Sequence, residues 1–149
     1  IIQAFGVGGR IAWGAILVRI GAEKGMAMLA FLAVLMSIGS ALAAVMTGAW
    51  PMPLIIAVCA LLGVSAEGWN GIFMAEVATQ APPDQTAAAT GISIGCTFSG
   101  VVIGPFIFGL LADVTGSYAT GFGLLAAVTG VAAIAIYLAH RRNLAAAVA

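Results

Sequence analysis

The sequence predicts an all-α membrane protein with five transmembrane helices. Hydrophobic residues make up 63% of its 149 residues, charged residues make up only 7%, and the mean hydropathy is +1.19. A soluble domain commonly devotes about a quarter of its residues to charge. The apolar runs here are about twenty residues long and do not alternate as barrel strands do. Because backbone polar groups in lipid must be satisfied internally, we expect these runs to be helices.

Charged and turn-forming residues divide the chain into these spans. The first span closes before Arg19, and the second closes at a Thr-Gly-Ala-Trp-Pro turn. The third ends where Pro82 and Pro83 block further helix. The fourth is broken after Asp113, and the fifth stops at His140. The predicted spans are residues 1–18, 26–46, 53–77, 86–111 and 119–139.

The chain begins at Ile1, inside an apolar run, without a methionine or a preceding basic stretch. We therefore expect no cleavable signal peptide, because such a peptide starts with a positively charged region. We also expect the 149 residues to be one partial transmembrane domain of a longer protein.

The basic residues predict the orientation in the membrane. Arg19 and Lys24 follow the first span, and Arg141 and Arg142 follow the fifth, whereas the loops at the opposite side carry no Lys or Arg. By the positive-inside rule, the basic side and the carboxy terminus are expected to be cytoplasmic. The expected location is the cell membrane, in multi-pass form, and the Ala and Gly content favours a bacterial inner membrane.

Several functional classes find no support in the sequence. The net charge of zero and the absence of basic-aromatic interleaving argue against a nucleic-acid partner. Cys59 and Cys96 lie inside apolar runs, and no metal-ligand spacing occurs, so we expect neither a metal nor a cofactor. Ser99 has no base near it, because the single histidine, His140, follows the last span. We expect no enzyme.

Arg10 is the most conspicuous polar residue. It precedes Arg19 by about 13 Å of helix, too deep to reach the interface easily. Gln3 and Trp13 belong to the same part of the first span. Two interpretations carry equal weight. Arg10 binds an anionic solute, since its guanidinium fork suits a carboxylate, or it forms an ion pair that locks helices together.

Glu67 lies near the middle of the third span, next to Trp69 and Asn70. A carboxylate at this depth is a candidate proton carrier, and Asn70 offers a donor and an acceptor to a solute. The alternative is that Glu67 only pairs with Arg10 or with another part of the protein. Glu76, near the basic end of the same span, is expected to bridge to Arg19 or Lys24 in a structural or gating role.

Glycine is concentrated in the first and fourth spans. Small residues about four apart let another helix approach closely, so helix packing is the expected role. Pro105 removes a backbone hydrogen bond and permits a hinge. The residues assigned to packing or hinging are Gly14, Gly95, Gly100, Gly104, Pro105 and Gly109.

Three segments, in this order and spacing, resemble the major facilitator superfamily of transporters. Residues 9–21 resemble the pattern G-R-x-x-x-G-x-x-x-D-R-x-G after the family's eighth helix, except that Val18 replaces the acidic residue. Residues 68–83 are similar to its tenth helix and the following loop. Residues 104–118 are similar to the end of its eleventh helix. The resemblance covers essentially the whole chain. It corresponds to helices eight to twelve of the family, which are five of the six helices in the carboxy-terminal half.

The resemblance implies a secondary transporter of a small solute, possibly an organic anion, that works by alternating access with a proton or a counter-solute. The third span would line the cavity, the first and fourth would meet the missing amino-terminal half, and the second and fifth would face the lipid bilayer. Arg19, Gly21 and Glu76 would belong to a cytoplasmic charge network, which with Val18 in place of the acidic residue relies on Arg19 with Glu76 or is weaker. The alternative is a non-transporting scaffold or receptor-like subunit, in which the polar residues only pack helices.

Overall fold

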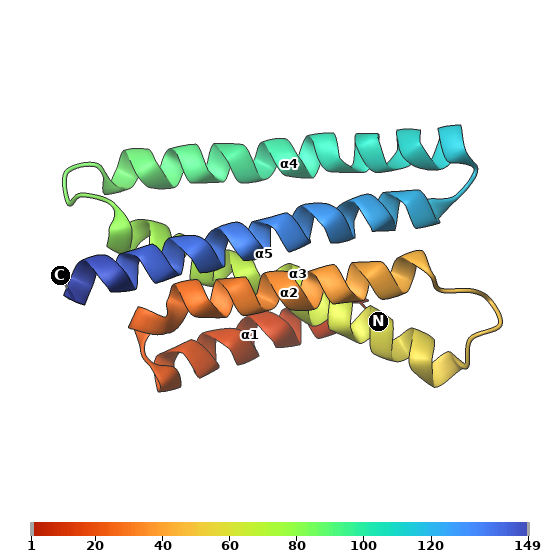
Figure 1. Ribbon diagram of the computed structural model, residues 1–149, viewed down its shortest axis with the longest axis horizontal. Coiled ribbons are helices and arrows are strands. Elements are labelled where there is room, and N and C mark those ends of the chain that lie inside the picture. Colours follow the sequence, from red (N-terminus) through yellow and green to blue (C-terminus); the bar gives the residue numbers. More distant parts are fainter. Residues whose placement is uncertain (1, 149) are drawn as a thin grey trace.

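The computed structural model describes residues 2–148, which form five long helices and one short 3-10 turn, with no strand among them (Figure 1). Four of these helices are long and apolar enough to cross a membrane, as in a multi-pass membrane protein. The helix α1 is not one of the four, since its 19 residues include Arg10 and Arg19. The elements are α1 (Ile2–Ile20), η1 (Ala22–Lys24), α2 (Gly25–Ala44), α3 (Met52–Gln80), α4 (Thr86–Thr115) and α5 (Tyr118–Val148).

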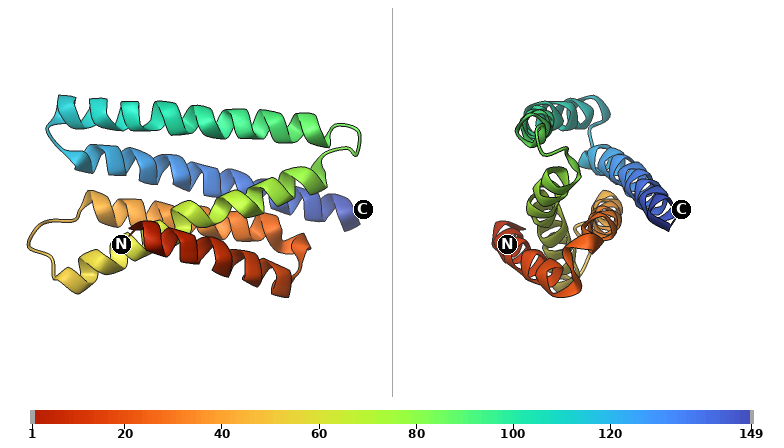
Figure 2. Two further views of the ribbon diagram at one scale, coloured as in Figure 1. Left: turned by 180° about the vertical axis from the view of Figure 1, so that it is seen from behind. Right: turned by 90° about the vertical axis from the view of Figure 1, so that its left-hand side faces the viewer.

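The helices form a bundle in which α3 crosses obliquely between its neighbours (Figure 2). On one side α1 runs along α3, and on the other α2 packs against both α3 and α5. The buried core lies where α2 meets α3 and consists of Met28, Leu29, Leu32 and Ile72. The helix α3 therefore lies at the centre of the arrangement, in contact with α1, α2 and α4.

One end of the bundle collects nearly all the basic residues. The end of α1, the start of α2 and the end of α5 lie together there (Figure 1). These segments carry Arg19, Lys24, Arg141 and Arg142, and we call this the basic end. The helix α5 continues past the predicted boundary at Ala139 to Val148, because nothing in its sequence stops a helix there.

Two glycines have positive φ and shape the connections between helices. Gly21, between α1 and η1, has a φ of +101°, and Gly116, which caps α4, has a φ of +68°. Such angles are strained for residues with a side chain, so glycine is the natural residue at both turns. Gly21 thus has a conformational reason to be present, besides the predicted role in a charge network.

The helices α1 and α3 approach closely through small residues. A methyl group at Gly9 would lie 2.9 Å from the backbone oxygen of Val64. Trp13 Nε1 donates a hydrogen bond of 3.1 Å to the same oxygen, and the Trp13 indole covers Gly68. Glycine at these positions lets the two backbones come together, as in other small-residue helix interfaces.

The substitution Gly9→Ala is expected to destabilise the α1–α3 pair by about 1–3 kcal/mol, because the new methyl group meets backbone atoms that cannot move aside. Gly8→Ala is the matched control, since a methyl group there would have no neighbour within 4 Å among the described residues. The measurement is unfolding of both variants in the same detergent. Equal stability of the two variants would contradict this packing.

The glycines of α4 do not pack against another helix within the described residues. None of the residues of α4 is buried. A methyl group at Gly95, Gly100, Gly104 or Gly109 would meet no atom of the described residues within 4 Å, and the same holds for Gly14 on α1. The helix also continues through Pro105 without a break. The predicted packing and hinging roles of these residues therefore find no partner in residues 2–148 and stay predictions.

Candidate functional site

Arg10 of α1 and Glu67 of α3 form an ion pair between the guanidinium Nη2 and the carboxylate Oε2. Arg10 Nε also donates a hydrogen bond of 3.2 Å to the backbone oxygen of Glu67. The two side chains are 57% and 38% exposed, respectively. Of the two interpretations of Arg10, the structure therefore forms the ion pair, and it does so on an open face of the bundle.

A third residue, Gly6, gives this pair its space. A methyl group at Gly6 would lie 2.6 Å from Glu67 Cγ, so glycine is the residue that lets the Glu67 side chain lie against α1. Gly6 was not among the residues that the sequence predicted for the site. Its position one turn before Arg10 is the signal that points to a shared face.

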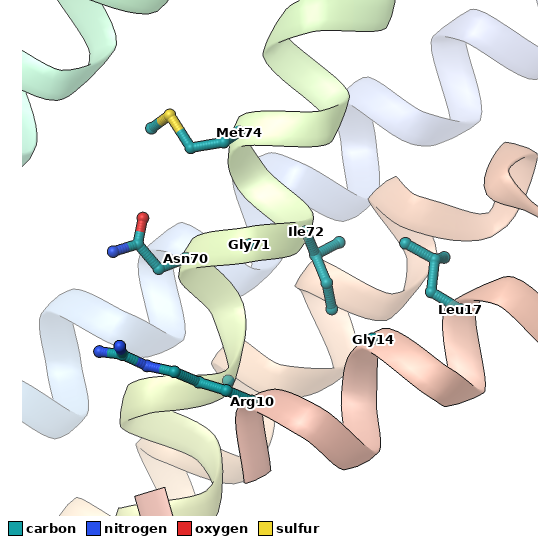
Figure 3. Close-up of a pocket in the computed structure, with 8 residues that line it drawn as sticks. Arg10, Gly14, Leu17, Asn70, Gly71, Ile72 and Met74 are labelled. Carbon is teal, nitrogen blue, oxygen red and sulfur yellow. The ribbon is translucent and has the colours of Figure 1, made fainter. Parts of the chain in front are cut away.

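A pocket of about 480 Å³ adjoins the ion pair. Arg10 and Asn70 point to the same side of α3 (Figure 3). Glycines of both helices also line the pocket and place no side chain in it. The Glu67 carboxylate, paired with Arg10, lies beside it. The lining residues are Arg10, Gly14, Leu17, Gly68, Asn70, Gly71, Ile72 and Met74.

The structure places the other predicted site residues away from this pocket. The Trp13 ring packs edge-on against Phe31, with 6.0 Å between ring centroids. Its indole N–H donates a hydrogen bond to the backbone oxygen of Val64 and is not free for a solute. Trp69 packs against Phe73 and lines a separate apolar cavity of about 320 Å³ among α2, α3 and α5. Gln3 is exposed on the first turns of α1 and is not part of the lining.

Glu76 does not pair with Arg19 or Lys24 within residues 2–148. Its Oε2 accepts a hydrogen bond of 2.8 Å from Gln80 Nε2, and its carboxylate lies against Gly25 at the start of α2. The partial positive charge at a helix N-terminus favours an anion at this point. The structure therefore gives Glu76 a tertiary contact with a helix end in place of the expected salt bridge.

Chemistry at the site is confined to charge and hydrogen bonding. No group of three or more His, Cys, Asp or Glu side chains that could hold a metal occurs within the part of the chain that the structure describes. The arrangement offers a guanidinium, a carboxylate and an amide beside one open pocket. These groups can form ion pairs and hydrogen bonds with a small polar solute.

Comparisons of the chain with protein-family models, with curated proteins and with solved structures find no match. The similarity to the major facilitator superfamily thus stands on the sequence motifs alone.

Proposed function

We propose that the chain is part of a secondary transporter of the major facilitator type, and that Arg10, Glu67 and Asn70 bind its solute. The observation that carries this proposal is the ion pair beside a pocket at mid-helix depth. Arg10 lies about 13 Å of helix from the basic end, and Glu67 lies near the middle of α3. A pair this deep and this exposed needs water or protein beside it, because acyl chains solvate charge poorly.

The pair leaves binding capacity free for an anionic solute. A guanidinium has five N–H donors, and the contacts to Glu67 use Nε and one position on Nη2. The remaining donors of Arg10 belong to a side chain that lines the pocket, together with the amide of Asn70. A carboxylate solute can therefore bind there without first removing Glu67.

The same pair provides a means of coupling transport to protons. When Glu67 takes up a proton, its carboxylate becomes a neutral acid and no longer holds the guanidinium by charge. The positive charge of Arg10 is then no longer neutralised by Glu67 and is free to pair with the solute. Proton uptake and anion binding thus favour each other at one site. Rocking of this half against the rest of the transporter would release both on the other side.

The substitution Arg10→Gln is expected to lower uptake of anionic solutes about tenfold or more, since charge-assisted hydrogen bonds contribute about 1.5–3 kcal/mol. The measurement is uptake by the full-length protein of a panel of organic anions and neutral solutes. Arg10→Lys is the control, because it keeps the positive charge but loses the planar guanidinium that can donate two parallel hydrogen bonds to a carboxylate. Anion uptake that is unchanged in Arg10→Gln would remove Arg10 from the site.

A second candidate function is a non-transporting scaffold, and the observation that favours it is the same ion pair, which ties α1 to α3. The exchange variant Arg10→Glu with Glu67→Arg separates the two candidates. A scaffold regains its stability and all its function on exchange. A transporter regains stability, but does not regain anion uptake, because the charge facing the pocket is reversed.

We also propose that the basic end is cytoplasmic and that the protein resides in the cell membrane. The support is the clustering of Arg19, Lys24, Arg141 and Arg142 at one end of the bundle. A reporter fused to the carboxy terminus, active only in the cytoplasm, tests the orientation. An inactive fusion of this reporter, together with an active fusion of a second reporter that works only outside the cytoplasm, would overturn it.

A further inference from the structure

A second hollow in the surface lies between α2 and α5, and its position is unrelated to the ion pair. It is a groove of about 580 Å³, with a floor of small residues and walls of larger apolar ones. Ala27, Ala30, Gly130 and Ala133 are the small residues. The larger and polar lining residues are Phe31, Val34, Ser37, Ile38, Ile134, Tyr137 and His140.

The groove has the length of one membrane leaflet. It extends along α5 from Gly130 to His140, which is about 15 Å at 1.5 Å per residue. That is about half of a hydrocarbon core of about 30 Å. Its inner end is near the point where Ser37 Oγ donates a hydrogen bond of 2.8 Å to the backbone oxygen of Ala126, which holds the two helices together. Its outer end opens at the basic end of the bundle.

Two basic residues flank that opening. Arg141 follows Tyr137 by one turn and therefore continues the face of α5 that lines the groove. Lys24 precedes Ala27 by three residues, at the start of α2. Tyr137 and His140 add a hydroxyl and an imidazole, and neither has a hydrogen-bond partner among the described residues. Glu23 and Glu76 line a neighbouring pocket that shares His140 with the groove, so the carboxylates lie on the other side of His140 from Tyr137 and Ile134.

We propose that this groove binds one phospholipid with an anionic headgroup. One acyl chain lies over the small residues from the opening to Ser37, and the phosphate lies at the opening, where Lys24 and Arg141 supply the positive charge. A lipid is the occupant that fits, because the groove is apolar over one leaflet and basic only at its end. Basic sites between transmembrane helices are known to take such headgroups.

The experiment uses nanodiscs made of equal amounts of phosphatidylglycerol and phosphatidylcholine with the same acyl chains. Native mass spectrometry then counts the lipids that stay bound to the released protein. We expect the protein to retain one phosphatidylglycerol, with a preference of about tenfold over phosphatidylcholine. Equal retention of the two lipids would overturn the proposal.

Two variants test the two parts of the site. Ala27→Trp fills the groove at an exposed position and is expected to abolish retention, whereas Ala135→Trp, on an exposed part of α5 outside the lining, leaves it unchanged. Lys24→Gln with Arg141→Gln is expected to remove the preference for phosphatidylglycerol, and Arg19→Gln on α1 is the charge control. Retention by Ala27→Trp equal to that of Ala135→Trp, or an equal loss of preference in Arg19→Gln, would contradict the assignment. Circular dichroism shows that each variant keeps its helices.

Discussion

Replacing Glu67 alone by Gln is expected to destabilise the protein by about 1 kcal/mol, more than replacing Arg10 and Glu67 together by Gln. The single change leaves Arg10 charged and without its partner, and the loss is modest because the pair is exposed on the face that is proposed to meet water. The double change removes both charges and with them the need for a partner. The measurement is a double-mutant cycle of unfolding in lipid bicelles.

The control for this cycle is Glu23→Gln. Glu23 is exposed beside the basic end and forms no ion pair within residues 2–148. Its replacement is therefore expected to change the free energy of unfolding very little. If the effects of the Arg10 and Glu67 changes simply add, the two side chains do not interact, and the site described above does not exist as a unit.

The substitution Leu32→Ala is expected to cost about 2 kcal/mol, at the low end of the range for buried leucines. Leu32 is 1% exposed and lies at the centre of the core between α2 and α3. The value is low because unfolding within a membrane transfers the side chain to lipid, so packing is lost but little hydrophobic transfer energy. The measurement is the unfolding free energy in detergent.

The same change at Leu42, an exposed position on α2, serves as the control and is expected to have almost no effect. Equal losses at the two positions would mean that the bundle is not held together by the core described here. A larger loss at Leu42 would place the true helix contact on the other side of α2.

The helical architecture followed from the sequence because hydropathy reports it directly. Four apolar runs became helices that could cross a membrane, and the predicted boundary at residue 86 matches the first residue of α4. The first span contains Arg10, and α1, although long enough, is correspondingly the helix that is not apolar enough to be counted among the four. The five-helix fold could therefore be predicted, whereas the membrane crossing of α1 stays a prediction.

The candidate site could be predicted only in part. Arg10, Glu67 and Asn70 were visible as polar residues in apolar runs, and an ion pair was one of the expected outcomes. Trp69 was grouped with Asn70, but neighbouring helix residues point about 100° apart at 3.6 residues per turn. Trp69 accordingly lines the apolar cavity, and Asn70 lines the pocket.

The contacts of single residues depend on how helices meet, and periodicity carries no information about that. Glu76 contacts Gly25 at the start of α2, and it pairs with neither Arg19 nor Lys24 within residues 2–148, although Lys24 immediately precedes Gly25. The conspicuous glycines of α4 have no neighbours in the described residues, whereas Gly6, Gly9 and Gly68 make the α1–α3 contact. Only the arrangement of the helices distinguishes the two groups.

Whether the ion pair faces water is the claim on which the proposed function depends, and thiol labelling in the membrane measures it most directly. The native Cys59 and Cys96 are first replaced by Ala, and Asn70→Cys is then compared with Val128→Cys, an exposed position on α5. Charged thiol reagents react with the thiolate, which forms only where water reaches it. Fast labelling at position 70 with slow labelling at 128 is the predicted result. Equally slow labelling at both positions would put the Arg10–Glu67 face against lipid and contradict the proposed solute path.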